Sequence, residues 1–187
     1  MAVDIFLVIR SNAANPPLGE SPTTDSYFLS TFPDAAVFEV SDFDFGVQNT
    51  VDIGSAATGA GAGKVSFGQL VIHRTVDKLS PSLLKLSSAG QHLAAIQLYL
   101  RHPNPSASAA ASAPFLAYEF QLVYISKIEW SAAAGADLTE EVTFEYGALA
   151  VAFQAANPDG TPAGTPVKGG WNQIQNTADV QDSIVLN

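Results

Sequence analysis

The chain has 187 residues, enough for one domain with a sizeable core, and 47% of them are apolar. Only 14% are charged, and 18 acidic residues against 8 basic ones give a net charge of −10. This acidic balance opposes phosphate backbones and anionic lipids, so nucleic acid and membrane are poor partner candidates. The low charge instead suits repeated contacts between copies of the chain. The lack of cysteine excludes disulfide bonds and thiolate metal sites.

The N-terminal sequence MAVDIFLVIR has neither the basic start nor the long apolar run of a signal peptide. No segment approaches the roughly 18 apolar residues that a membrane span needs. We therefore expect the chain to be made and folded in the cytoplasm, which is compatible with later export by a dedicated machine.

The first part of the chain predicts strands and one long loop. Residues 3–9 have apolar side chains at every second position, which is the period of a strand. Residues 11–36 are rich in Pro, Asn, Ser and Thr, and they predict a long extended loop. Residues 37–45 form a further strand whose apolar phase changes near Ser41 and Asp42, which predicts a β-bulge.

Further strands are expected along the rest of the chain. Residues 65–76 are strand-like, with a bend at Gly68, where no side chain opposes it. Residues 96–100, 115–125 and 142–153 complete the set. The second of these segments is expected to present five large apolar residues on one face: Leu116, Tyr118, Phe120, Leu122 and Tyr124.

One short helix interrupts the β pattern, in the segment SPSLLKLSSAG. Ser80 is placed to cap its start, Pro81 suits the first helical position, and Gly90 suits the end. The leucines expected to face inward are Leu83, Leu84 and Leu86. The sequence thus predicts a mainly β domain with one short flanking α-helix.

The connections in the second half are low in complexity. Residues 101–114 contain HPNPSASAAASAP and predict a long surface loop. The segment ANPDGTPAGTPVKGG near the C-terminus predicts a Pro/Gly linker, and we expect a polar tail from residue 169 onward.

A glycine-rich segment, TGAGAGKVS, is similar to a phosphate-binding loop, in which glycine amides and a lysine hold a phosphate. It departs from that motif at Thr58, where glycine is required, and at Val65, where Ser or Thr is required. A strand also follows Lys64, where the motif needs a helix. We therefore predict a loop that enters a strand, and no nucleotide cofactor.

The adjacent Glu140 and Glu141, with Asp137 nearby, are the best candidates for the paired carboxylates of a glycosidase. Neighbouring residues of a strand point to opposite faces, which separates the two side chains. We interpret these residues as the solvated start of a strand. The sequence therefore predicts no catalytic residue and no enzymatic activity.

The histidines and tryptophans offer no specific site either. His73, His92 and His102 lack the spacing of a metal site, so we expect surface or hydrogen-bonded histidines and no metal. Trp130 and Trp171 favour core packing or a subunit contact. A carbohydrate-stacking platform is the alternative for these two aromatic rings.

A set of short motifs runs in a fixed order along nearly the whole chain. They are MAVD at the start, Gly19-Glu20-Ser21, Phe43-Asp44-Phe45-Gly46, Lys64-Val65, Val76-Asp77-Lys78 with Pro81, Gly90 and His92, LTEEV from Leu138, PVK from Pro166 and GWN from Gly170. In this order they resemble the haemolysin co-regulated protein (Hcp) family, the ring-forming tube proteins of bacterial type VI secretion systems.

The resemblance implies a closed, barrel-like β-sandwich with one flanking helix, in a single domain over residues 1–187. It also implies that six copies form a ring, that rings stack into the inner tube of a type VI secretion system, and that the tube carries exported effectors. The implied partners are copies of the chain, sheath and spike proteins, and effector proteins. The resemblance implies no cofactor and no catalysis. It implies assembly in the cytoplasm followed by secretion.

The resemblance also suggests roles for individual residues. Asp44 stands where the family has a serine that faces the pore and contacts cargo, so six copies are expected to line the pore with acid. Our hypothesis is that this acid favours basic or polar cargo. Ring or stacking contacts are expected at Glu20, Ser21, Lys64, Asp77 and Lys78.

Other functional classes stay open at this point. A tail-tube subunit of a phage-like or extracellular contractile injection device shares the same architecture. A sugar-binding β-sandwich and a carboxylate hydrolase are the alternatives from other classes. A hexamer in solution supports the tube, a monomer that binds a glycan column supports the sugar-binding module, and glycoside turnover abolished by Glu140→Gln supports the hydrolase.

Overall fold

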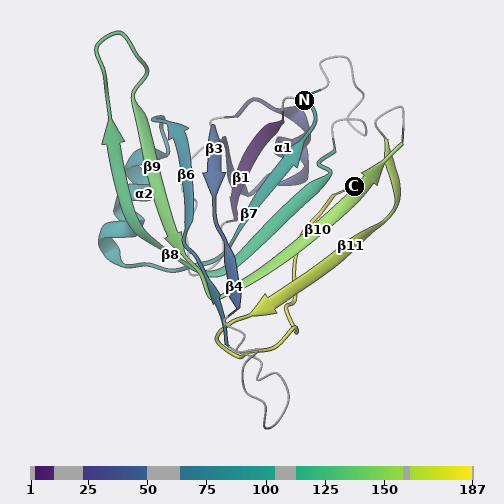
Figure 1. Ribbon diagram of the computed structural model, residues 1–187. Helices are drawn as coiled ribbons and strands as arrows, with labels where there is room; N and C mark the ends of the chain where they lie inside the picture. Colours follow the sequence, from purple (N-terminus) through teal and green to yellow (C-terminus); the bar gives the residue numbers. More distant parts are fainter. Residues whose placement is uncertain (1–2, 11–22, 50–63, 104–112, 158–160, 187) are drawn as a thin grey trace.

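The computed structural model describes residues 3–10, 23–49, 64–103, 113–157 and 161–186 (Figure 1). Antiparallel strands dominate these ranges, and two short helices accompany them. The helices are α1 (Ser26–Thr31) and α2 (Ser80–Ala89). The strands are β1 (Asp4–Arg10), β2 (Ala35–Glu39), β3 (Asp42–Asp44), β4 (Val47–Asn49), β5 (Val65–Phe67), β6 (Leu70–Thr75), β7 (Leu93–Arg101), β8 (Leu116–Ser131), β9 (Thr139–Glu145), β10 (Ala148–Ala156) and β11 (Pro162–Asn172).

One sheet joins most strands in the order β2-β1-β7-β8-β9-β6-β3, and β10 and β11 extend it from β8. Its two ends, β2 and β3, are parts of one chain segment with only Val40 and Ser41 between them. The Val40 amide donates to Ile5 of β1, and the Ser41 amide donates to His73 of β6. The sheet therefore curves back on itself through the chain, while no ladder joins β2 to β3 within the described ranges. The prediction of a mainly β, barrel-like fold is confirmed, but its closure by strand pairing is not observed.

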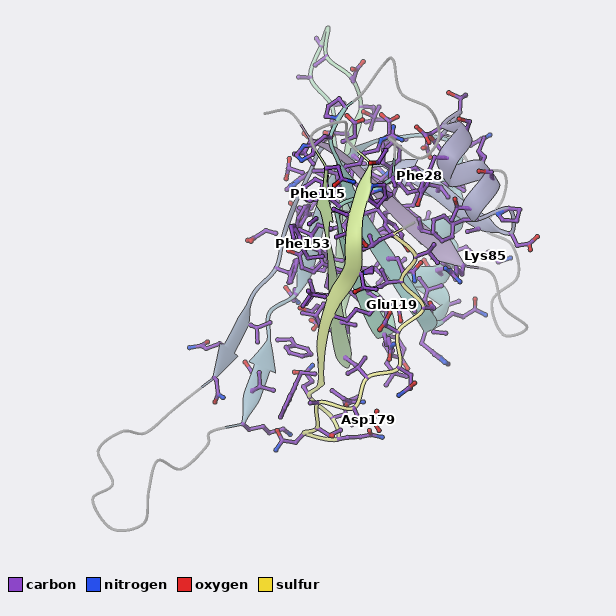
Figure 2. The ribbon with its side chains drawn as sticks, turned by 90° about the vertical axis from the view of Figure 1, so that its right-hand side faces the viewer. Phe28, Lys85, Phe115, Glu119, Phe153 and Asp179 are labelled. Carbon is purple, nitrogen blue, oxygen red and sulfur yellow. The ribbon has the colours of Figure 1, made fainter. Side chains whose placement is uncertain are left out.

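The remaining two strands, β4 and β5, form a separate ribbon that projects from the body of the molecule (Figure 2). Gly68 and Gln69 separate β5 from β6, which confirms the predicted bend at Gly68. The β-bulge predicted near Ser41 and Asp42 is wrong. The predicted strand is divided there into β2 and β3, because the chain leaves β1 and begins to pair with β6. Neither α1 nor α2 is long and apolar enough to cross a membrane, and the described residues contain no other helix.

Strand β8 serves both halves of the curved sheet. Its first part pairs with β7 and β10, and its last part pairs with β9. Between them Leu122 has a φ of 54°, a left-handed conformation that is uncommon for leucine. The kink inverts the alternation, so that Leu122 and Tyr124 are each 46% exposed while Val123 and Ile125 are buried. The expectation that Leu122 and Tyr124 share the buried face of Phe120 is therefore wrong.

Two apolar clusters stabilise the fold. The larger lies between the two halves of the sheet and beneath α2, and it includes Leu7, Ile72, Leu83, Phe120 and Phe144. The second lies on the opposite face of β1 and β7, where α1 and the C-terminal segment (residues 173–186) cover it; it includes Phe6, Phe28, Tyr99, Ile184 and Leu186. Burial of each large apolar side chain contributes about 1.5 to 3 kcal/mol. Strands β1 and β7 are thus buried on both faces.

Helix α1 lies within the segment predicted as an extended loop, so the prediction of a single helix is wrong. Asp25 ends the preceding loop, and its Oδ1 accepts hydrogen bonds from the amides of Tyr27 and Phe28 at 3.1 and 3.2 Å. Both aromatic side chains are buried, and the Phe28 ring lies 4.3 Å from that of Phe6. Tertiary burial therefore stabilises a helix that is too short to be stable alone.

Helix α2 occupies the predicted segment, and Gly90 ends it with a left-handed φ of 61°. Leu83 and Leu86 are buried as predicted, but Leu84 is largely exposed. Ser80 is the first helical residue rather than the cap, and its hydroxyl donates to a buried glutamate at 2.8 Å.

The C-terminal part differs from the prediction in two ways. Residues 142–153, expected as one strand, are divided at Tyr146 and Gly147 into β9 and β10, and both continue along β8. The expected Pro/Gly linker instead forms β11, which pairs with β10 and reaches Asn172. The tail therefore begins after Asn172 and not at residue 169. Figure 2 shows it running beside β11 over the sheet.

Candidate functional site

Two rows of polar side chains cross β6, β9 and β8 on opposite faces of the sheet. The strand register aligns Arg74 with Glu140 and Glu140 with Trp130. One residue along, it aligns His73 with Glu141 of β9. Because alternate residues of a strand point to opposite faces, the first row points into the fold and the second points outward. The predicted separation of Glu140 and Glu141 is confirmed.

The outward row continues onto β3 and β8 and forms a chain of charged contacts. His73 Nδ1 lies 2.6 Å from Asp42 Oδ1, and His73 Nε2 lies 3.1 Å from Glu141 Oε2. Lys127 Nζ lies 3.2 Å from Glu141 Oε1 and 2.8 Å from Glu129 Oε2. We call this set (Asp42, His73, Glu141, Lys127 and Glu129) the charged row. It ties four adjacent strands together at the surface.

The contacts in the charged row favour the ionised forms of His73, Glu141 and Lys127. The hydrogen bond with Asp42 is the main cause that raises the pKa of His73 above its usual value. The hydrogen bond from Lys127 is the main cause that lowers the pKa of Glu141. Hydrogen bonds with Glu129, the main cause, and with Glu141 raise the pKa of Lys127. These side chains are partly exposed, so solvent screens each pair and their main effect is on local charge.

Asp44 lies on the same surface, next to the charged row. It is the last residue of β3, pairs with Val71 of β6, and is exposed. Its neighbours Phe43 and Phe45 point the other way, with ring centres 6.0 Å apart, and pack against the core. The structure therefore presents Asp44 to solvent on the face of Asp42. We call this surface of β3, β6, β9 and the last part of β8 the charged face.

The inward row is a buried ion network. Arg74 and Glu140 are each 1% exposed, so the interpretation of Glu140 as a solvated residue is wrong. Glu140 Oε1 accepts from the Ser80 hydroxyl at 2.8 Å, and Oε2 accepts from the Trp130 indole at 3.0 Å. Arg74 Nη1 lies 3.4 Å from Glu140 Oε1, within ion-pair distance but without hydrogen-bond alignment. Its Nη2 pairs with Asp77.

The residues expected at ring contacts occupy separate places. Glu20 and Ser21 lie outside the described residues. Lys64 is exposed at the start of β5, and Lys78 is exposed between β6 and α2. Asp77 has a structural role, because its Oδ1 accepts from the Leu79 amide at 2.8 Å at the start of α2. The glycine-rich segment lies mostly outside the described residues, and strand β5 follows Lys64 as predicted.

The other candidate side chains are surface groups. The His92 ring lies 5.7 Å from Tyr124, and the His102 ring stacks on Phe115 at 4.4 Å. Trp130 is about half exposed and is not a core residue. The part of the chain that the structure describes contains no cluster of three or more His, Cys, Asp or Glu side chains suited to a metal ion.

Strands β10 and β11 carry an apolar surface that is exposed in the described part of the chain. Phe153 of β10 and Val167 of β11 are directly opposed and are 49% and 74% exposed. Tyr118 and Val151, on the same face, are partly buried. We call these four residues the apolar wing. Figure 2 shows Phe153 on the side of the sheet away from Glu119 and the C-terminal segment. In the described ranges β11 forms a ladder only with β10, and a single bridge joins its last residue, Asn172, to Thr177. The outer edge of β11 before Asn172 therefore has no strand partner within these ranges.

The sequence model of the family described as Type VI secretion system effector, Hcp, matches residues 34–153. The chain belongs to the Hcp family. This Hcp chain is also 34% identical over 114 residues to Protein hcp1 of Pseudomonas aeruginosa, across 60% of the chain and 68% of that protein. The predicted family is therefore confirmed, and the chain is a type VI secretion system protein.

Solved structures share the fold of this Hcp chain. A structure described as a type six secretion system protein matches with a TM-score of 0.74 at 21% identity, covering 94% of this chain and 99% of that one. Hcp1 from Salmonella typhimurium matches with a TM-score of 0.65 at 19% identity, covering 94% and 98%. These likenesses concern the fold, and they support the predicted β architecture of an Hcp protein.

The sequence of this Hcp chain gives little sign of the charged row. His73, Glu141 and Asp42 are far apart in the chain and have no motif spacing. Only the pairing of β3 with β6 and of β6 with β9 brings them together. The apolar wing was missed for a related reason, since the prolines and glycines of β11 suggested a linker.

Proposed function

We propose that this Hcp-family chain is a structural subunit of the inner tube of a type VI secretion system. Six copies form a ring, rings stack into a tube, and the tube carries exported effectors within a sheath and beneath a spike protein. Assembly takes place in the cytoplasm, and secretion follows. The subunit catalyses no reaction in this proposal.

The apolar wing is the observation that supports ring formation most strongly. Phe153 and Val167 form a solvent-exposed apolar pair beside the open edge of β11. Open edges and exposed apolar pairs favour association with another chain. A cyclic ring uses two different patches of each subunit, so the wing packs against a different surface of the neighbouring copy. The low charge of the chain, 14% of its residues, suits burial of such patches.

The charged face is the surface we assign to the pore. Asp44 is exposed there beside Asp42, and the aromatic residues that flank it point into the fold. Six copies give a ring of carboxylates that attracts cationic cargo segments. We further propose that Lys64, Asp77 and Lys78, with Glu20 and Ser21, contribute to contacts within or between rings.

Native mass spectrometry tests the ring. We expect a species of six 19.5-kDa chains for the wild type. The double variant Phe153→Asp/Val167→Asp places unpaired charge in the proposed interface and is expected to give smaller species. Leu84→Asp is the matched control, because Leu84 is a similarly exposed apolar residue on α2. A monomeric wild type refutes the ring, and an intact hexamer of the double variant refutes the role of the wing.

Cargo retention by the assembled ring tests the assignment of the charged face. Asp44→Lys is expected to weaken retention of basic effectors. It is expected to leave the hexamer intact, because the exposed Asp44 side chain points away from the face on which Phe43 and Phe45 contact Tyr118 of the wing. Unchanged retention by this variant counts against a pore position for Asp44.

A further inference from the structure

His73 occupies an unusual position for an exposed histidine, between two carboxylates on neighbouring strands. Its Nδ1 faces Asp42 of β3 at 2.6 Å, and its Nε2 faces Glu141 of β9 at 3.1 Å. Ionised carboxylates only accept hydrogen bonds, and a neutral imidazole donates from one nitrogen alone. Only the doubly protonated ring satisfies both contacts. The geometry thus fits an imidazolium ion.

We propose that His73 is a proton-controlled internal competitor for the carboxylates that bind cationic cargo segments on the charged face. This inference rests on the proposed pore position of that face. When His73 is protonated, it occupies Asp42 and one oxygen of Glu141, and these oxygens are less available to an arginine or lysine of the cargo. When it loses its proton, both carboxylates lose this partner and become available.

The charge of the surrounding groups sets the direction of the effect. The groups that share the face of His73 are Asp42 and Asp44 from β3, Glu141 and Glu145 from β9, and Lys127 and Glu129 from β8. On its own strand, the charged Arg74 points to the opposite face. Five carboxylates against one lysine give −4 when His73 is neutral and −3 when it is protonated. A rise in pH therefore strengthens the attraction of the face for cations.

Lys127 does not replace His73 in this role. It contacts Glu141 Oε1 and Glu129, on the far side of Glu141 from the histidine. It also keeps its charge across neutral pH, because its pKa is raised from an already high value. Among the cationic groups of the charged row, His73 alone changes charge near neutrality. The hydrogen bond with Asp42 is also the main cause that raises its pKa above the usual histidine value.

Peptide binding across a pH series tests the inference. The probe is a fluorescein-labelled Arg-Gly repeat peptide of about 12 residues, with affinity measured by anisotropy from pH 5.5 to 8.5 at about 0.1 M ionic strength. Arginine stays charged throughout this range. We expect the affinity of the wild type for the peptide to rise about fivefold over this pH range. This factor corresponds to the interaction between two unit charges about 4 Å apart in water.

Two variants assign the effect to His73. His73→Asn is expected to show high affinity with little pH dependence, because Asn cannot acquire the competing charge. His102→Asn, which changes a histidine stacked on Phe115 away from the charged face, is expected to retain the full wild-type dependence. A His73→Asn protein whose affinity still rises fivefold overturns the inference, and so does a wild type whose affinity falls or stays constant with pH.

Nitrogen-edited NMR of the histidine side chains gives an independent readout. Both ring nitrogens of His73 are expected to be protonated at pH 6, with a pKa above the usual histidine value of about 6.5. Asp42→Asn is expected to lower this pKa, because it removes the main cause of the increase. A pKa of His73 below the usual histidine value contradicts its role as a competitor. Because the peptide and NMR measurements do not require a ring, a monomer in native mass spectrometry refutes the proposed tube function without deciding the result for His73.

Discussion

Replacing Arg74 by Met tests whether the buried ion network stabilises the fold. The Arg74 side chain is 1% exposed, pairs with Asp77 and Glu140, and lies with its guanidinium 4.1 Å from the centre of the Phe38 ring. Met retains an unbranched chain that packs against Phe38 but carries no charge. The variant therefore removes the electrostatic contacts and leaves most of the packing.

The free energy of unfolding is expected to fall by about 3 kcal/mol. Removing one member of a buried ion pair costs about 3 to 5 kcal/mol, because the other charge stays buried. Glu140 keeps two donors, the Ser80 hydroxyl and the Trp130 indole, which places the cost at the lower end. For a domain of this size, the midpoint of thermal unfolding is expected to fall by about 6 to 12 °C, at about 2 to 4 °C per kcal/mol.

Urea unfolding followed by tryptophan fluorescence, at one fixed protein concentration, measures the change. Lys127→Met is the matched control, because Lys127 also pairs with carboxylates of β8 and β9 but is largely exposed. Exposed ion pairs contribute little to stability, so the control is expected to unfold close to the wild type. Equal destabilisation by the two variants refutes the role assigned to the buried network.

The variant Gly170→Ala is expected to lose more stability than Gly147→Ala. A Cβ at residue 170 meets a backbone carbonyl oxygen at 3.0 Å, which cannot move easily. A Cβ at residue 147 meets the flexible tip of an exposed isoleucine side chain at 2.5 Å, which can move away. Urea midpoints test this order, and the reverse order contradicts it. Ending the chain after Asp182 removes two buried aliphatic side chains and two hydrogen bonds to the buried Glu119. We expect a loss of about 3 to 6 kcal/mol from burial alone, and an unchanged urea midpoint rules this out. The wild type is expected to have a higher free energy of unfolding than His73→Asn. This difference is expected to be greatest below a pH of about 6.5 and to disappear as the pH rises through the raised pKa of His73. A difference that grows with pH, measured by urea unfolding from pH 5.5 to 9, disproves it.

Features that depend on one short segment were predictable from the sequence. The apolar side chains at every second position of residues 3–9 predict the strand that forms as β1, and α2 is marked by Pro81 and Gly90 within a single segment. The exposure of Asp44 also follows from local alternation, since Phe43 and Phe45 flank it. In these cases the side chains that decide the structure are neighbours in the chain.

Features that depend on partners from distant segments were not predictable. Glu140 is buried because β6 brings Arg74 beside it, and nothing near Glu140 in the sequence indicates that partner. Helix α1 forms because its aromatic residues pack on β1 and β7. Strand β11 contains prolines and glycines, which suggest a linker, yet pairing with β10 stabilises it as an edge strand, where proline is tolerated.

The kink in β8 also makes the fold sensitive to changes in chain length. Because the side chains of a strand alternate, the loss of one residue turns the following side chains to the other face. Suppose that Gln121, just before Leu122, were deleted while the pairing of β8 with β9 was kept. Phe120 would then turn to the opposite face of the sheet, and Glu119 would take the place of Phe120 in the larger apolar cluster. The 16 residues of β8 contain no loop that could absorb such a change. Insertions and deletions among natural sequences of this fold are therefore expected to gather in the connections between strands, while the length of β8 stays constant.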